Sequence, residues 1–214
     1  MSEKNFSALR LDEFFARTAG PEPNPGGGGV MGVVGALGLG LNAMGLCISG
    51  EKTAQQKEAM QTLVSLAELD GDSFQAVLDA WKLPKGSAER KQAVEAGFQE
   101  ALRIPETMIT LLLEALQEQA ELAQKVKRWP LADVAAGTKL LVAAVEGLVY
   151  NCWMNGKELR DPSHRETHRT FARRALQQAY AAEAAVHEVL VARWSGFDEW
   201  LGRDSKDGLD FDGN

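Results

Sequence analysis

The chain has 214 residues, of which 45% are apolar, and this is enough for one domain with its own hydrophobic core. Its formal charge of −7 argues against a general nucleic-acid-binding protein, because such proteins present a basic face. Two cysteines, Cys47 and Cys152, are too few for a disulfide framework. The N-terminal residues include acidic side chains and no apolar run of signal-peptide length, so we expect a cytoplasmic protein.

Helix-forming residues dominate the whole chain, and alternating β-branched runs are absent. The sequence therefore predicts an all-α fold, a single-domain bundle of about six to seven helices over residues 1–201. An acidic, glycine-containing tail, residues 202–214, is expected to be disordered. The expected helices lie near residues 7–17, 30–49, 53–84, 87–103, 105–127, 130–154 and 161–200.

Four consecutive glycines, Gly26, Gly27, Gly28 and Gly29, lead directly into the uncharged helix expected at 30–49. Glycine lets a backbone come close to another group, and the free N–H groups of a helix start can bind an anion. A flexible turn that feeds a buried helix would have the same sequence. The run therefore marks a candidate binding site without deciding between the two interpretations.

The segment 30–49 is also long and apolar enough to be considered as a membrane span. Against this stand its glycines, Asn42, and the absence of a flanking cluster of Lys or Arg. Small residues four apart, from Gly28 to Gly40, indicate close packing against another helix. We therefore expect no membrane span here, but a helix buried within a soluble bundle or dimer.

Two acidic residues fall within otherwise apolar helical patterns. Asp70 lies on the apolar stripe of the third expected helix, where a buried carboxylate must be paired, hydrogen-bonded or protonated. Asp133 lies in the first turn of the apolar helix expected at 130–154, where the helix dipole favours an acid. A structural ion pair for Asp70 and simple helix capping for Asp133 remain alternatives.

Asn151 and Asn155 lie four residues apart on one face at the end of the same helix, among apolar and aromatic neighbours. Their amides need partners, such as a ligand or a neighbouring backbone. Asp133 and Asn151 are separated by roughly 27 Å along that helix, because each residue adds 1.5 Å. Both can act at one site only on a long ligand, or if a dimer brings opposite ends together.

Other polar features have ordinary interpretations. Lys52 and Lys85 lie in a moderately basic stretch that could attract an anion or simply be a solvated surface. His164 and His168 share a helical face, but the glutamate between them does not fit a zinc-protease pattern, and no further ligand completes a metal site. We interpret that segment as a solvated helix start.

Several motifs, taken together and in their order along the chain, resemble those of the cyclodeaminase/cyclohydrolase family of folate one-carbon enzymes. Pro25 and the three glycines after it match the family's Pro-Gly-Gly-Gly-Ser signature, except that Gly29 replaces the serine. Asp70-Gly71-Asp72-Ser73-Phe74 is similar to the family's acidic segment, and Leu83-Pro84-Lys85 matches its Leu-Pro-Lys. Ala132-Asp133 stands where the family has Ser-Asp, and the pattern continues to Asn151 and Asn155.

The resemblance implies a helical homodimer that acts on a tetrahydrofolate derivative and needs neither a metal nor a nucleotide cofactor. Such an enzyme adds water to 5,10-methenyltetrahydrofolate, or forms that compound from 5-formiminotetrahydrofolate with loss of ammonia. Under this hypothesis Asp133, with Asp70 second, transfers protons or stabilises the cation. Lys52 and Lys85 hold the folate carboxylates.

The same hypothesis gives the remaining polar groups a substrate-binding role. Gly26–Gly29 offer backbone N–H groups to the substrate, and the amides of Asn151 and Asn155 hydrogen-bond its ring atoms. Two departures, Gly29 and Ala132 in place of serines, leave open a non-catalytic folate-binding protein or a helical dimerisation module of the same fold. No formiminotransferase segment is recognised in the chain, which favours the cyclohydrolase reaction.

Overall fold

The computed structural model describes residues 6–21 and 24–202, and the regular structure within these ranges is entirely helical. This confirms the expected all-α class. The tail expected at 202–214 lies, apart from Gly202, outside the described residues. The elements are η1 (Phe6–Ala8), α1 (Leu11–Thr18), α2 (Gly27–Ser49), α3 (Ala54–Ser73), α4 (Gln75–Lys82), α5 (Ala88–Gln117), α6 (Gln119–Lys125), α7 (Leu131–Gly156), α8 (Pro162–Arg193) and α9 (Phe197–Trp200).

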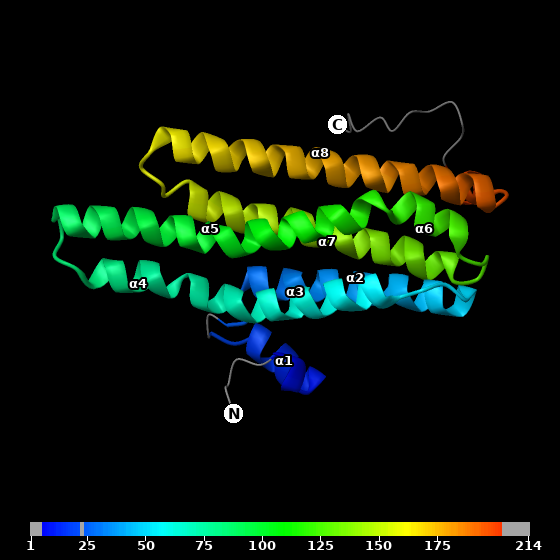
Figure 1. The fold of residues 1–214 in the computed structure, drawn as a ribbon, viewed down its shortest axis with the longest axis horizontal. Coiled ribbons are helices and arrows are strands. Elements are labelled where there is room, and N and C mark those ends of the chain that lie inside the picture. Colours follow the sequence, from blue (N-terminus) through cyan, green and yellow to red (C-terminus); the bar gives the residue numbers. More distant parts are fainter. Residues whose placement is uncertain (1–5, 22–23, 203–214) are drawn as a thin grey trace.

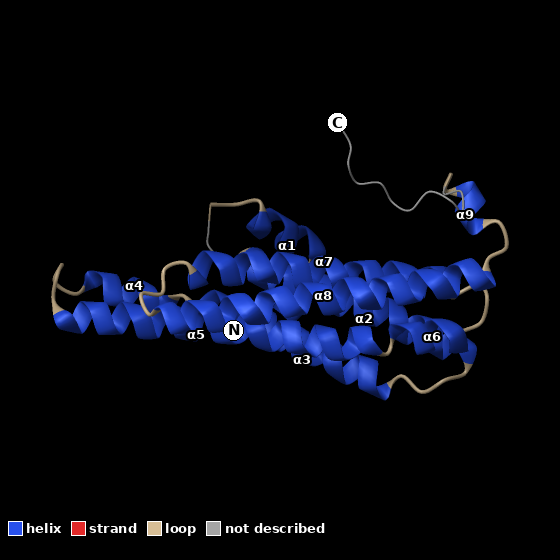
Figure 2. Ribbon diagram, turned by 90° about the horizontal axis from the view of Figure 1, so that it is seen from above, coloured by secondary structure: helices blue, strands red, loops and turns tan. Residues whose placement is uncertain are grey.

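The long helices run nearly side by side in layers, with α8 on one side, α5 and α7 in the middle, and α2 and α3 on the other (Figure 1). Helix α7 is central because it packs against α2, α5 and α8. Seen from above, the bundle is elongated, and α9 lies beyond one end of α8 (Figure 2). The main core contains apolar residues from six helices, among them Leu39, Leu63, Val77, Leu112, Leu148 and Ala179.

Helix α2 is packed closely on two sides, and its glycines make this possible. A Cβ atom at Gly32 would lie 2.7 Å from the Ala67 Cβ of α3, and one at Gly38 would lie 2.8 Å from the Gly137 carbonyl oxygen of α7. By length and composition, α2 is the one described helix that could cross a membrane, and half of its apolar 18-residue segment is buried inside the bundle. A core helix passes the same test, so its apolar character agrees with the packing seen here.

The helix expected at 53–84 is two helices, α3 and α4, which meet at Phe74. The Ser73 hydroxyl donates to the Asp70 carbonyl oxygen at 2.7 Å and so offers this backbone an alternative to the helical pattern. Thr53 is the N-cap residue of α3, but its side chain accepts no cap hydrogen bond. The break places Asp70 in the last turn of α3.

The sequence predicted that Pro105 begins a helix, but this residue lies inside the continuous helix α5. Proline lacks the N–H that would bind the carbonyl oxygen four residues earlier, which here belongs to Ala101. The Asn155 side chain of α7 donates to that oxygen at 3.3 Å. Tertiary packing thus supplies the missing donor, and burial of Pro105 in the core keeps α5 intact.

Two expected helix starts are confirmed by their caps. The Ser87 side chain accepts from the Arg90 N–H at the start of α5, and the Asp161 carboxylate accepts from the Ser163 N–H at the start of α8. The last helix ends earlier than expected, at Arg193. Gly196, with φ of 77°, then turns the chain in the left-handed region before the short α9.

Candidate functional site

The start of α2 meets an acid from α3. Gly26 is the N-cap residue in extended conformation, and it offers no side chain to the N–H groups of the first turn. The Gly29 N–H donates to the Asp70 carboxylate. The helix start therefore binds an anion, as the glycine run suggested, and this anion is the carboxylate of Asp70 in the same chain.

Three helices converge at Gly28. A Cβ atom there would lie 2.3 Å from Asp70 Oδ2 and 2.4 Å from Asn151 Nδ2, so only glycine fits without a shift. The carboxylate of α3, the amide of α7 and the backbone of α2 are thus in direct proximity. The structure brings together Asp70, Asn151 and the glycine run, which lie far apart in the sequence.

Asp70 carries the one strongly shifted carboxyl group among the described residues. Burial raises its pKa from 3.8 to about 6, and the hydrogen bond from the Gly29 N–H opposes this only in part. A carboxyl group with a pKa near neutrality can both donate and accept a proton at physiological pH. No described lysine or arginine forms a salt bridge with it, so the expected alternative of a structural ion pair is not what the structure shows.

The two asparagines have different tasks. Asn155 Nδ2 is 3.3 Å from the Ala101 carbonyl oxygen and 3.4 Å from Asn151 Oδ1. Its amide is therefore used inside the protein, where it replaces the donor lost at Pro105 and fixes the Asn151 oxygen. With its oxygen held, Asn151 directs Nδ2 toward Gly28 and Asp70.

Cys152 lies next to Asn151 but is unsuited to nucleophilic chemistry. Burial, together with the negative charges of Glu106 and Asp70, raises its thiol pKa to about 12. The thiol is therefore protonated at neutral pH. Cys152 is a wall residue behind the site.

Asn24 is a polar group at this site that the sequence analysis did not single out. Its side chain packs on Gly71, where a Cβ atom would lie 2.6 Å from Asn24 Cγ. Its Oδ1 is buried without a hydrogen-bond partner among the described residues. Asn24 precedes the motif at Pro25, and only the fold reveals that it lies beside the residue that follows Asp70.

The other predicted site residues lie elsewhere in the subunit. Val134, next to Asp133, packs on Gly45 near the end of α2, which is the end opposite to Gly28. Lys52 follows that same end of α2, and its side chain is exposed. Lys85 lies in the turn between α4 and α5. This turn is at the end of the bundle opposite to the connection between α2 and α3 (Figure 1). Within one subunit, none of these three joins Asp70 and Asn151.

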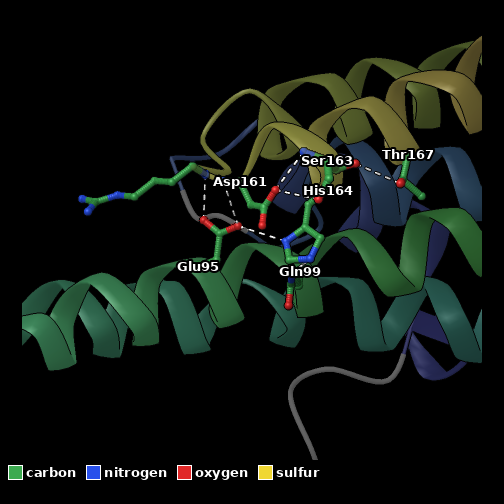
Figure 3. Close-up of polar contacts among 7 residues, drawn as sticks. Glu95, Gln99, Asp161, Ser163, His164 and Thr167 are labelled. Carbon is green, nitrogen blue, oxygen red and sulfur yellow. Dashed lines mark hydrogen bonds and ion pairs between the residues drawn. The ribbon is translucent and has the colours of Figure 1, made fainter.

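A second polar cluster holds the start of α8 against α5 (Figure 3). Glu95 accepts from the backbone N–H of Arg160 at 2.7 Å and contacts His164 Nδ1 at 3.2 Å. Burial alone would raise the pKa of Glu95, but these hydrogen bonds lower it overall. His168 pairs in the same way with Glu106 of α5. The interpretation of a merely solvated helix start was wrong for these histidines, because each is tied to a glutamate of the neighbouring helix.

Across 6–21 and 24–202, no group of three His, Cys, Asp or Glu side chains could hold a metal ion. The groups that meet at the start of α2 are thus one carboxyl group, side-chain amides and backbone N–H groups. This donor set suits hydrogen bonding and proton transfer.

Comparison with known proteins identifies the group to which this arrangement belongs. The model of the formiminotransferase-cyclodeaminase family matches residues 10–174. The chain belongs to this family. All the residues that meet at the start of α2 lie within the matched segment.

Relatives and a solved structure agree with the family. The chain is 27% identical to formimidoyltransferase-cyclodeaminase of Gallus gallus over 89% of its own length, and it spans 38% of that relative. It is 26% identical to methenyltetrahydrofolate cyclohydrolase of Methylorubrum extorquens, with 86% of this chain and 96% of that protein covered. The crystal structure of formiminotetrahydrofolate cyclodeaminase from Thermotoga maritima superposes with a TM-score of 0.77 at 25% identity, covering 87% and 98% of the two chains.

Proposed function

We propose that this protein is a folate one-carbon enzyme. It interconverts 5,10-methenyltetrahydrofolate and 10-formyltetrahydrofolate, or forms the methenyl compound from 5-formiminotetrahydrofolate with release of ammonia. The observation that carries the proposal is the Asp70 carboxyl group, with a pKa of about 6, held by Gly29 beside Asn151. The names of the relatives, a cyclohydrolase and cyclodeaminases, support the same chemistry.

Both reactions require the proton transfers that Asp70 can perform. In hydration, its carboxylate accepts a proton from the water that attacks the methenyl carbon. Its acid form then protonates N5 as the bond between N5 and that carbon breaks, and the remaining hydroxyl proton is released as the formyl carbonyl forms. In the other reaction, N10 attacks the formimino carbon and the bond from that carbon to the departing nitrogen breaks; the proton that N10 loses and the proton that the acid form of Asp70 donates leave this nitrogen as ammonia. The carboxylate also stabilises the methenyl cation electrostatically. The proposed chemistry uses no metal and no nucleotide.

The neighbouring polar groups orient the substrate in this proposal. Asn151 Nδ2 donates to a ring acceptor of the folate, and the buried Oδ1 of Asn24 accepts from a ring N–H. The N–H groups at the start of α2 that Asp70 leaves available add donors. Asn155 acts through Asn151 and does not touch the substrate.

The test is a spectroscopic assay of the purified protein with both substrates. Loss of methenyltetrahydrofolate absorbance would identify the hydration, and its appearance from 5-formiminotetrahydrofolate would identify the deamination. Asp70→Asn is expected to lower kcat by about 10² to 10⁴-fold, because it removes a general acid–base group. Binding of folate without turnover by the wild type would favour the non-catalytic alternative. The replacement of two family serines by Gly29 and Ala132 supports that alternative.

We also propose that the enzyme is a homodimer in which the active site combines two subunits. Helix α2 leaves Leu37, Met44 and Ile48 exposed, at 60%, 41% and 51%. Helix α7 runs antiparallel to α2, so one end of this pair holds Gly28 and the other holds Asp133. A two-fold axis at the middle of α2 would place Asp133 of the partner subunit near Asp70.

Mixed dimers test this arrangement. Asp70→Asn and Asp133→Asn are each expected to be inactive alone. When they are unfolded together and refolded, half of the dimers combine one of each, and each mixed dimer regains one intact site. Activity should therefore return to about a quarter of the wild-type value. Full activity of Asp133→Asn alone, or no recovery in the mixture, would contradict the shared site.

A further inference from the structure

Pro105 leaves a free hydrogen-bond acceptor in the interior of α5. It gives the helix no N–H for the Ala101 carbonyl oxygen, which precedes it by four residues. Ala101 and Pro105 are both buried, so bulk water does not reach this oxygen. The donor is instead Nδ2 of Asn155, at 3.3 Å. A backbone group of α5 is therefore available to a side chain of α7 because residue 105 is a proline.

This acceptor determines how the Asn155 amide is turned. A carbonyl oxygen only accepts hydrogen bonds, so Asn155 must direct its NH₂ group, and not its own oxygen, toward Ala101. The same NH₂ group lies 3.4 Å from Asn151 Oδ1. Because Asn155 offers a donor, Asn151 must direct its oxygen toward Asn155 and its own NH₂ group away from it. The direction fixed at Ala101 is thus passed on through two amides.

The chain of amides ends at the candidate site. Asn151 Nδ2 and Asp70 Oδ2 both lie within 2.4 Å of the point that a Cβ atom at Gly28 would occupy. An NH₂ group in this position complements the carboxylate and can donate to a substrate, whereas an amide oxygen would face the carboxylate with a second acceptor. The donor that Asn151 presents beside Asp70 therefore depends on the acceptor that Pro105 leaves free.

We propose that Pro105 is a positioning residue of this site, which acts through Asn155 to keep the Asn151 NH₂ group facing Asp70. Its effect on turnover rests on the proposed function, but its effect on the amides does not. With alanine at position 105, the new N–H binds the Ala101 oxygen as in an ordinary helix, and the constraint on the Asn155 amide is relaxed. Asn151 can then turn either its NH₂ group or its oxygen toward Asp70.

Kinetics test whether these residues act as one chain. In the methenyl absorbance assay, Pro105→Ala should lower kcat/KM by about fivefold to tenfold, because one hydrogen bond to the substrate is no longer held in place. Asn155→Leu should lower it by a similar factor. The double variant Pro105→Ala/Asn155→Leu should lose no more than the worse single variant, because both substitutions act through Asn151. Losses that multiply in the double variant would overturn the proposal.

Pro162→Ala is the matched control for the loss of a proline. Pro162 lies at the start of α8, where the missing N–H would have no partner within the helix. This variant should keep the kcat/KM of the wild type. Equal activity of Pro105→Ala and Pro162→Ala would also overturn the proposal.

A second readout needs no turnover. NMR titration of the ligand-free protein should give Asp70 a pKa above the wild-type value of about 6 in Pro105→Ala, because the carboxylate no longer faces a fixed donor. Pro162→Ala should titrate as the wild type does. An unchanged pKa of Asp70 in folded Pro105→Ala would contradict the positioning role, since a merely structural role would alter the urea midpoint alone. If the wild type turns over neither folate compound, the proposed function fails, and this titration decides the role of Pro105.

Discussion

Gly28 is the position where a single methyl group should do the most damage to the candidate site. In Gly28→Ala the new Cβ would lie 2.3 Å from Asp70 Oδ2 and 2.4 Å from Asn151 Nδ2. Ordinary contacts of a Cβ begin at 3.4 Å, so each polar group would have to move by about 1 Å. The Asp70 carboxylate would then lose its alignment with the Gly29 N–H.

The size of the effect follows from this displacement. Misplacing catalytic groups by 1 Å costs about 10²-fold in rate, so kcat/KM for methenyltetrahydrofolate should fall by about that factor. Overpacking also destabilises, by about 1–3 kcal/mol. The new alanine regains up to about 1 kcal/mol through its better helix propensity. The loss of activity should therefore exceed what the loss of stability explains.

Two other glycines of α2 provide controls. Gly32→Ala would place its Cβ 2.7 Å from the Ala67 Cβ, in the core and away from the polar groups, and should lower stability with little effect on kcat. Gly40→Ala meets only Met60 Sδ at 3.7 Å within the subunit and should preserve the stability of the fold. Urea unfolding and the methenyl absorbance assay would be run on all three variants. A folded Gly28→Ala protein with kcat/KM within twofold of wild type would refute the assignment of this site.

The remaining predictions concern the pKa of Asp70 and the carbonyl group freed by Pro105. Because the folded pKa of Asp70, about 6, exceeds its unfolded value of 3.8, folding favours the protonated form, and this stability is lost as pH rises from about 4 through 6. By urea unfolding, Asp70→Asn should therefore be up to about 3 kcal/mol more stable than wild type at pH 7 and nearly equal to it at pH 4. The variant should also lack the inflection of kcat near pH 6. A stability difference between variant and wild type that does not change with pH would contradict the raised pKa. Asn155→Ala should lower the free energy of unfolding by about 1–3 kcal/mol, since it leaves the Ala101 carbonyl oxygen unpaired. The loss should be smaller in a Pro105→Ala background, because the new N–H of residue 105 binds that oxygen. Equal losses in the two backgrounds of this double-mutant cycle would disprove the coupling between Asn155 and Pro105.

The sequence predicted much of the fold because local patterns determine helices. Caps at Ser87 and Asp161 begin helices where expected, and the glycine run begins α2. Errors came where tertiary contacts override local rules. Pro105 is tolerated inside α5 because Asn155 supplies the donor that proline lacks, and the donor comes from a helix 50 residues later in the chain.

The candidate site divides in the same way. Composition and motif order identified Asp70, the glycines and Asn151 as unusual polar or small groups in apolar surroundings, and hence as candidates. Which of them meet is a matter of distance in three dimensions, and only the packing of α2 between α3 and α7 decided it. That packing joined Asp70 to Gly29 and Asn151, left Asp133 and Lys52 at the other end of α2, and raised the pKa of Asp70 by burial, a desolvation that no local sequence can specify.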